Sequence, residues 1–133
     1  MNARTALNAY KTAKNEIVID DASPHQLITM LLDGAIERVT AAVGAMDRGE
    51  IAVSGASIGK AISIIDNLRV SLDQHQGGQI AENLASLYEY MTRRLLEANA
   101  TKDTAMLTEV TGLLREIKVA WDQVPADLHH ASE

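Results

Sequence analysis

Apolar residues recur in four separate stretches of this chain, at alternating steps of three and four positions. This step keeps them on one face of an α-helix, because a helix completes a turn in about 3.6 residues. The stretches run over Ile28–Met46, Ile51–Leu72, Ile80–Ala98 and Met106–Val124. Four apolar stripes of similar length with short connections predict an all-α fold, an antiparallel up-down four-helix bundle.

The residues that flank these stretches support the same boundaries. Ser23 can cap the first helix, Pro24 suits its first position, and Gln26 would complete a capping box. Gly49 is expected to close that helix in the left-handed conformation, and Pro125 to end the last one. The expected organisation is an N-terminal cap segment, a four-helix bundle and a disordered tail, at residues 1–22, 23–125 and 126–133.

The N-terminal segment differs from the four long stripes. Residues 3–14 place apolar side chains on one helical face, but a helix under about 15 residues is marginal in water. We therefore expect this segment, helical or extended, to become ordered only when it docks on the bundle.

Composition and charge narrow the class of protein. Hydrophobic residues make up 47% of the 133 positions, yet there is no Phe and one Trp, so the core must be aliphatic. The net charge of −6, without a basic cluster, disfavours nucleic acid as a partner. The chain has no cysteine, no secretory signal and, on inspection, no segment apolar enough to span a bilayer. These features predict a cytoplasmic protein that does not insert into membranes.

Candidate catalytic and metal-binding patterns are weak. The chain contains no Glu-x-x-His pair of the kind that di-iron bundles use, and no glycine loop that could cradle a nucleotide. His75 precedes Gly77 and Gly78, which superficially resembles a phosphotransfer histidine, but the glycines predict the end of a helix there. We expect no enzyme activity, no metal and no cofactor.

Several apolar residues remain after the stripes are assigned. Ile64, Val70 and Tyr90 lie furthest from the stripes of their own helices, although each could also be a wide-stripe core position. Leftover apolar positions on a rigid bundle are what a protein that binds extended or helical peptides would need. The residues alone therefore indicate a helical interaction module.

Four sequence blocks resemble one known family in order and spacing. They are Ala22–Ala35, which includes Ser-Pro-His-Gln-Leu, Lys60–Leu68, Asn83–Asn99, which includes Tyr-x-Tyr-Met-x-Arg-Arg-Leu, and Glu109–Leu114 leading to Trp121. Together they are similar to the flagellin chaperone family FliS. The resemblance implies a four-helix bundle that binds the disordered C-terminal segment of flagellin in the cytoplasm, prevents premature polymerisation, and delivers it to the gate of the flagellar type III export apparatus. Some members of the family also bind the flagellar anti-sigma factor.

The resemblance also suggests partner-binding residues. It places Leu7 and Tyr10 in an N-terminal piece that can pack on the client-binding surface of the bundle, and we expect client binding to displace these two residues. For the groove itself we expect contributions from Ile64, Asn67, Val70, Tyr90, Arg93 and Arg94. The two arginines could donate to client carbonyls or carboxylates, or could simply pair with Glu89 and Glu97 on a charged helix face.

Two alternatives to the chaperone hypothesis remain open from the sequence. One is a histidine-phosphotransfer-like signalling bundle, and the other is a generic helical dimerisation module.

Overall fold

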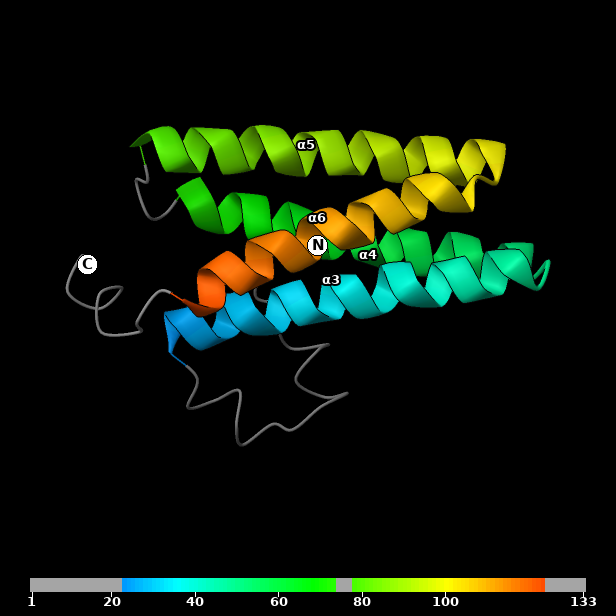
Figure 1. The fold of residues 1–133 in the computed structure, drawn as a ribbon, viewed down its shortest axis with the longest axis horizontal. Coiled ribbons are helices and arrows are strands. Elements are labelled where there is room, and N and C mark those ends of the chain that lie inside the picture. The colour runs from blue at the N-terminus through cyan, green and yellow to red at the C-terminus, as the bar shows by residue number, and fades with distance from the viewer. Residues whose placement is uncertain (1–22, 74–77, 124–133) are drawn as a thin grey trace.

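The computed structural model describes residues 23–73 and 78–123, which form four helices (Figure 1). They are α3 (Pro24–Asp47), α4 (Ile51–Asp73), α5 (Gly78–Thr101) and α6 (Thr104–Asp122). Each packs against its neighbour in sequence, and α3 also packs against α6, so the four helices close into a ring. The predicted all-α four-helix bundle is confirmed. The expected N-terminal segment, the expected tail and His75 lie outside the described residues.

The first helix begins at the predicted capping box. The Ser23 hydroxyl accepts a hydrogen bond from the Gln26 backbone N–H at 3.2 Å, and Gln26 Oε1 accepts one from the Ser23 N–H at 2.8 Å. Pro24 occupies the first turn, where its missing N–H removes no intrahelical bond. These contacts satisfy two backbone donors that a helix start otherwise leaves unpaired.

Two tight connections reverse the chain direction. Gly49 has φ 77° and Lys102 has φ 57°, so both residues adopt the left-handed conformation just after a helix. Beyond them, the Glu50 N–H donates to the Ala45 carbonyl at 2.8 Å, and the Asp103 N–H donates to Ala98 at 3.1 Å. These six-to-one bonds are the closing contacts of a Schellman motif, and they turn each helix back against the next.

The core is built from one aliphatic stripe of each helix, with Tyr88 as its aromatic member. Its buried residues are Leu31, Leu32, Ala35, Val39, Ala42, Met46, Ile58, Ala61, Ile65, Leu68, Tyr88, Met91, Leu95, Ala98, Leu107, Val110 and Leu114. Three buried polar side chains donate to a carbonyl of their own helix, in the pairs Ser54–Ile51, Asn67–Ser63 and Thr111–Leu107. Their hydrogen bonds are therefore satisfied without crossing the core.

Two positions predicted for the stripes are not in the core. Ile51 is 44% exposed and Ile80 is 73% exposed. Ile51 is the first residue of α4, and Ile80 lies in the first turn of α5. Residues in the first turn of a helix lie at the end of the bundle, so they are covered only where neighbouring helices extend equally far.

The most apolar helix is α4, and it corrects one expectation from the sequence. Its segment Ile51–Leu72 has a mean hydropathy of 1.2, so it is long and apolar enough to cross a membrane. Core helices of globular proteins meet the same criterion, and α4 contributes Ile58, Ala61 and Ile65 to the shared core. However, only 33% of the apolar window is buried. The large apolar residues of α4 that lie on the surface are Ile51 and Val53, at its N-terminal end.

Because Gly49 closes α3 with a positive φ, we predict that Gly49→Ala destabilises the bundle by about 1 kcal/mol. The matched control is Gly112→Ala, since a methyl group added at Gly112, inside α6, would meet no atom within 4 Å. That control should stabilise the protein by about 1 kcal/mol through helix propensity. Urea unfolding measures both changes. A shift of the same sign in both variants would contradict the special requirement at Gly49.

Candidate functional site

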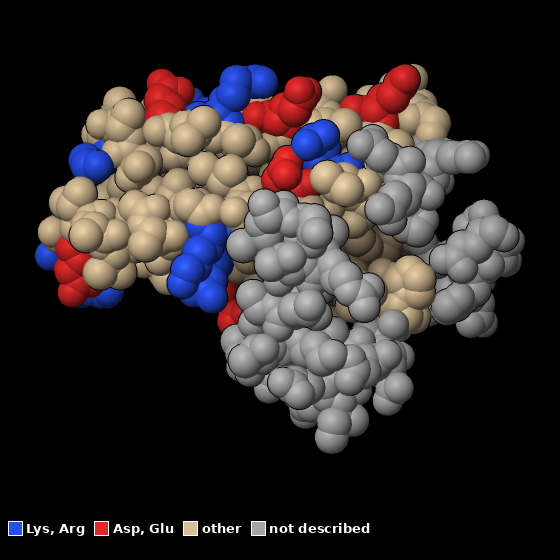
Figure 2. Space-filling view, turned by 180° about the vertical axis from the view of Figure 1, so that it is seen from behind, with Lys and Arg blue, Asp and Glu red and all other residues tan. Residues whose placement is uncertain are grey.

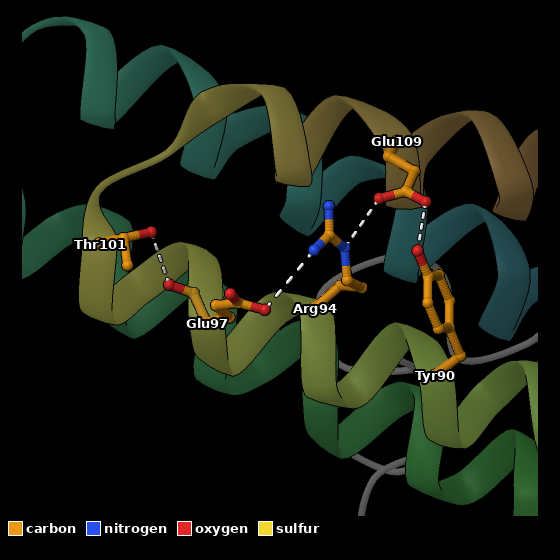
Figure 3. Close-up of polar contacts among 5 residues, drawn as sticks. All are labelled: Tyr90, Arg94, Glu97, Thr101 and Glu109. Atoms are coloured by element: carbon orange, nitrogen blue, oxygen red, sulfur yellow. Dashed lines mark hydrogen bonds and ion pairs between the residues drawn. The ribbon is translucent and has the colours of Figure 1, made fainter.

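A polar cluster joins α5 to α6 on the surface of the bundle (Figure 3). The Tyr90 hydroxyl donates to Glu109 Oε2 at 2.5 Å, and Arg94 Nε donates to Glu109 Oε1 at 2.8 Å. The Arg94 guanidinium also lies 3.5 Å from Glu97 Oε1, and its carbon is 5.9 Å from the centre of the Tyr90 ring. Since Tyr90 and Arg94 are one turn apart on α5, together they reach both oxygens of one carboxylate.

The hydrogen bonds in this cluster shift three pKa values. The Tyr90 hydroxyl and the Arg94 guanidinium donate to the ionised Glu109 carboxylate and hold its pKa below the usual value. The same carboxylate raises the pKa of Tyr90 and the pKa of Arg94. The cluster therefore favours an ionised Glu109 that fastens α6 to α5.

A second set of contacts fastens α6 to α3. The rings of His25 and Trp121 stack with centres 4.8 Å apart, Trp121 Nε1 donates to the His25 carbonyl at 3.1 Å, and His25 Nε2 lies 3.2 Å from the Trp121 carbonyl oxygen. Lys118 Nζ lies 3.0 Å from Asp122 and 3.5 Å from Asp33. The hydrogen bond to Asp122 and the negative charge of Asp33 raise the pKa of Lys118. Helix α6 is thus held on both of its flanks by polar side chains.

A depression of about 260 Å³ lies between α4 and α5. Its lining residues come from both helices and are Ile65, Asp66, Arg69, Tyr88, Glu89, Thr92 and Arg93. Tyr88 is 3% exposed, and burial raises the pKa of its hydroxyl to about 12. This hydroxyl therefore stays protonated at neutral pH and can donate a hydrogen bond.

The six predicted groove residues within the described part of the chain lie on α4 and α5 and point in different directions. Tyr90 and Arg94 point from α5 toward α6 (Figure 3), whereas Arg93 is exposed and lines the depression toward α4. On α4, Ile64 packs against the core, Asn67 is 4% exposed, and Val70 is half-buried. The other two predicted residues, Leu7 and Tyr10, lie outside the described residues.

The outward face of α4 carries small side chains. Ala52, Ala56, Gly59 and Ser63 recur on one helical face, and all four are exposed. The helix has no Lys, Arg, Asp or Glu before Lys60. Seen from the side where α4 faces the viewer, the charged side chains lie mainly along the edges of a broad uncharged area (Figure 2). This face can accept close contact with an apolar partner.

The described residues thus combine two kinds of surface. Polar side chains hold α6 in place. In contrast, the N-terminal half of α4 presents an uncharged surface, and a depression lies between α4 and α5. Within residues 23–73 and 78–123, no three His, Asp or Glu side chains gather as they would around a metal ion. The arrangement is suited to binding another polypeptide.

Two features of the site were missed by sequence reasoning. The sequence pattern pairs neither Glu109 with Tyr90 and Arg94 nor His25 with Trp121. The partners are separated by 19 and 96 residues, so no local pattern could pair them. The available signal was weak in both cases: a carboxylate off the core stripe, and the single Trp of the chain at the end of the fourth stripe.

We predict that Glu109→Ala lowers the free energy of unfolding by roughly 1 kcal/mol, because it removes the acceptor for Tyr90 and Arg94 from a solvent-screened cluster. The control Glu116→Ala removes the same atoms from an exposed position of α6 and should cost much less. Since the folded pKa of Glu109 is lowered, its contribution is present above the usual carboxyl pKa of 4.5 and is lost as pH falls through the lower folded value. Urea unfolding at pH 7 and pH 3 measures this, and an unchanged difference between the two variants at pH 3 would contradict it.

Comparison with known proteins identifies the family. The family model "Flagellar protein FliS" matches residues 6–128. The chain is 48% identical to flagellar secretion chaperone FliSB of Pseudomonas aeruginosa, over 93% of this chain and 98% of that protein. It is 43% identical to flagellar secretion chaperone FliS of Vibrio cholerae, over 96% of this chain and 93% of that protein. It is 30% identical to flagellar secretion chaperone FliS of Bacillus subtilis, over 84% of this chain and 83% of that protein. The resemblance found in the sequence is confirmed, and the chain belongs to the FliS family of flagellar secretion chaperones.

Proposed function

We propose that this protein binds the C-terminal segment of flagellin in the cytoplasm, prevents its premature polymerisation, and presents it to the gate of the flagellar type III export apparatus. The family supplies the role of secretion chaperone. The flagellar anti-sigma factor is a second proposed partner. Neither binding nor release of such a client requires a catalytic residue, a metal or a nucleotide.

The observation that carries this proposal is the exposure of α4. The window Ile51–Leu72 is the most apolar helical segment of the described chain, yet only 33% of it is buried. Ile51 and Val53, at the N-terminal end of this window, are 44% and 53% exposed, and exposed apolar residues that lie close together can mark a site where a partner binds. The exposed face holds mostly small side chains, so a client backbone can approach α4 closely, as small residues allow between packed helices.

A client that is disordered when free suits this surface. Folding on binding can bury roughly 1,000–3,000 Å² while ordering the segment consumes about 2–5 kcal/mol. Because the cost of ordering the segment offsets part of the free energy gained by burial, the complex can be tight enough to block self-assembly and can still release its client. The polar fastenings of α6 at Glu109 and at Trp121 keep the platform rigid during this exchange.

The predicted groove residues take different roles in this proposal. Arg93 and Val70 contact the client, Arg93 through its exposed guanidinium and Val70 through its half-buried side chain. Ile64 and Asn67 position α4, since one packs against the core and the other is buried. Tyr90 and Arg94 use their polar groups within the bundle, so any client contact is made by the Tyr90 ring and the remaining Arg94 donors.

We further propose that Leu7 and Tyr10 cover the client-binding surface of the bundle in the free protein and move aside when flagellin binds. Amide hydrogen exchange with and without client is expected to show residues 3–14 losing protection on binding. Equal protection in both states would overturn the displaceable cap while leaving flagellin binding itself untouched.

Calorimetric titration with the C-terminal segment of flagellin from the same organism is the test of function. We predict one-to-one binding with a negative heat-capacity change, because apolar surface becomes buried. No heat at tens of micromolar, with a folded protein and an intact segment, would remove flagellin as the client.

The same titration tests the proposed surface. Ala56→Glu places a charge on the exposed face of α4 and should weaken binding by about tenfold or more, because the charge must be desolvated or must exclude the client. Ala105→Glu makes the same change at an exposed position of α6 and should leave the affinity unchanged. Equal affinities for the two variants would place the client elsewhere on the bundle.

A further inference from the structure

The depression between α4 and α5 is lined in part by Tyr88, a buried residue with a polar group that the described part of the bundle does not pair. Tyr88 is 3% exposed, and its hydroxyl makes no hydrogen bond with any residue in the described part of the chain. A buried hydroxyl without a partner is unfavourable, so a native protein usually pairs it. The hydroxyl of Tyr90, two residues away, does have a partner in Glu109. The two tyrosines therefore serve different purposes on the two sides of α5.

The depression has room for a side chain of a bound polypeptide. Its volume of about 260 Å³ is below the roughly 300–1,000 Å³ of pockets that take a free cofactor or a drug-sized molecule. Ile65 and Tyr88 form its apolar part and belong to the core cluster, so they hold a fixed shape. A single residue of a bound polypeptide fits such a space.

The charges around the depression indicate a neutral, polar occupant. Asp66 and Glu89 contribute two carboxylates, and Arg69 and Arg93 contribute two guanidinium groups, so the rim has no net charge. Arg69 already pairs with Asp66 at 2.7 Å. The rim therefore selects neither an anion nor a cation, whereas an Asn or Gln amide can accept from the Tyr88 hydroxyl and also donate to a carboxylate.

We propose that the depression is an anchor subsite for an Asn or Gln side chain of the client, held by the Tyr88 hydroxyl and flanked by Arg93. The subsite rests on the proposed function, because it assigns the client chemistry at the edge of the same α4 surface. Arg93 is exposed and makes no ion pair within the described residues, so its guanidinium can donate to client carbonyls beside the anchor.

The test removes the oxygen atom of the Tyr88 hydroxyl and compares the result with loss of a hydroxyl elsewhere on the bundle. Tyr88→Phe should weaken binding of the C-terminal flagellin segment by about three- to tenfold, the usual effect of one hydrogen bond, without lowering the unfolding temperature. Thr108→Val is the control: it removes a hydroxyl group from an exposed position of α6, away from the proposed α4 surface, and should leave the affinity unchanged. Replacing each Asn and Gln of the client by Ala should then reveal one position whose loss adds nothing in Tyr88→Phe.

Each outcome bears on a different statement. If wild-type protein binds the segment and Tyr88→Phe binds equally well, the subsite is wrong while the proposed function stands. If Tyr88→Phe loses affinity but no client amide couples to it, the Asn or Gln anchor is wrong. If wild-type protein does not bind the segment, flagellin is not the client, and the subsite falls with it.

Discussion

The burial of one aliphatic stripe from each helix is the constraint on which the rest of the structure depends. Because the chain has no Phe and one Trp, close packing must be achieved with Leu, Ile, Val, Met and Ala, which allow helices to approach closely. Such a core occupies a narrow face of each helix. The remaining faces are free for two other tasks, fastening the bundle and presenting a surface to a partner.

Local structure was predictable where its cause is local. The capping box of Ser23 and Gln26, the left-handed Gly49 and the four apolar stripes each follow from residues within a few positions of one another. The exposure of Ile80 was not predictable, because it depends on how far neighbouring helices extend. Lys102 in the left-handed conformation was also missed, since the glycine that normally signals such a helix end is absent there.

Contacts between helices were beyond the reach of the sequence. Tyr90 was expected to face a client, and nothing near it in the chain indicates that Glu109 would accept a hydrogen bond from its hydroxyl. Likewise, Arg93 and Arg94 are adjacent in sequence but lie on opposite sides of α5, one beside α4 and the other beside α6. Adjacent helical residues differ in direction by about 100°, so their roles are decided by which neighbour each one meets.

The two borders of α5 show how stability and binding are divided in this fold. Toward α6, the polar groups of Tyr90, Arg94 and Glu109 satisfy one another, which strengthens the bundle but leaves little for a partner. Toward α4, the Tyr88 side chain is buried and its hydroxyl makes no hydrogen bond within residues 23–73 and 78–123, and the adjoining face of α4 is uncharged and exposed. Each of these features lowers the stability of the free protein, since both leave groups imperfectly satisfied. A client that covers the α4 face and pairs the Tyr88 hydroxyl would relieve both costs at once, so the same features that weaken the free bundle would favour the complex.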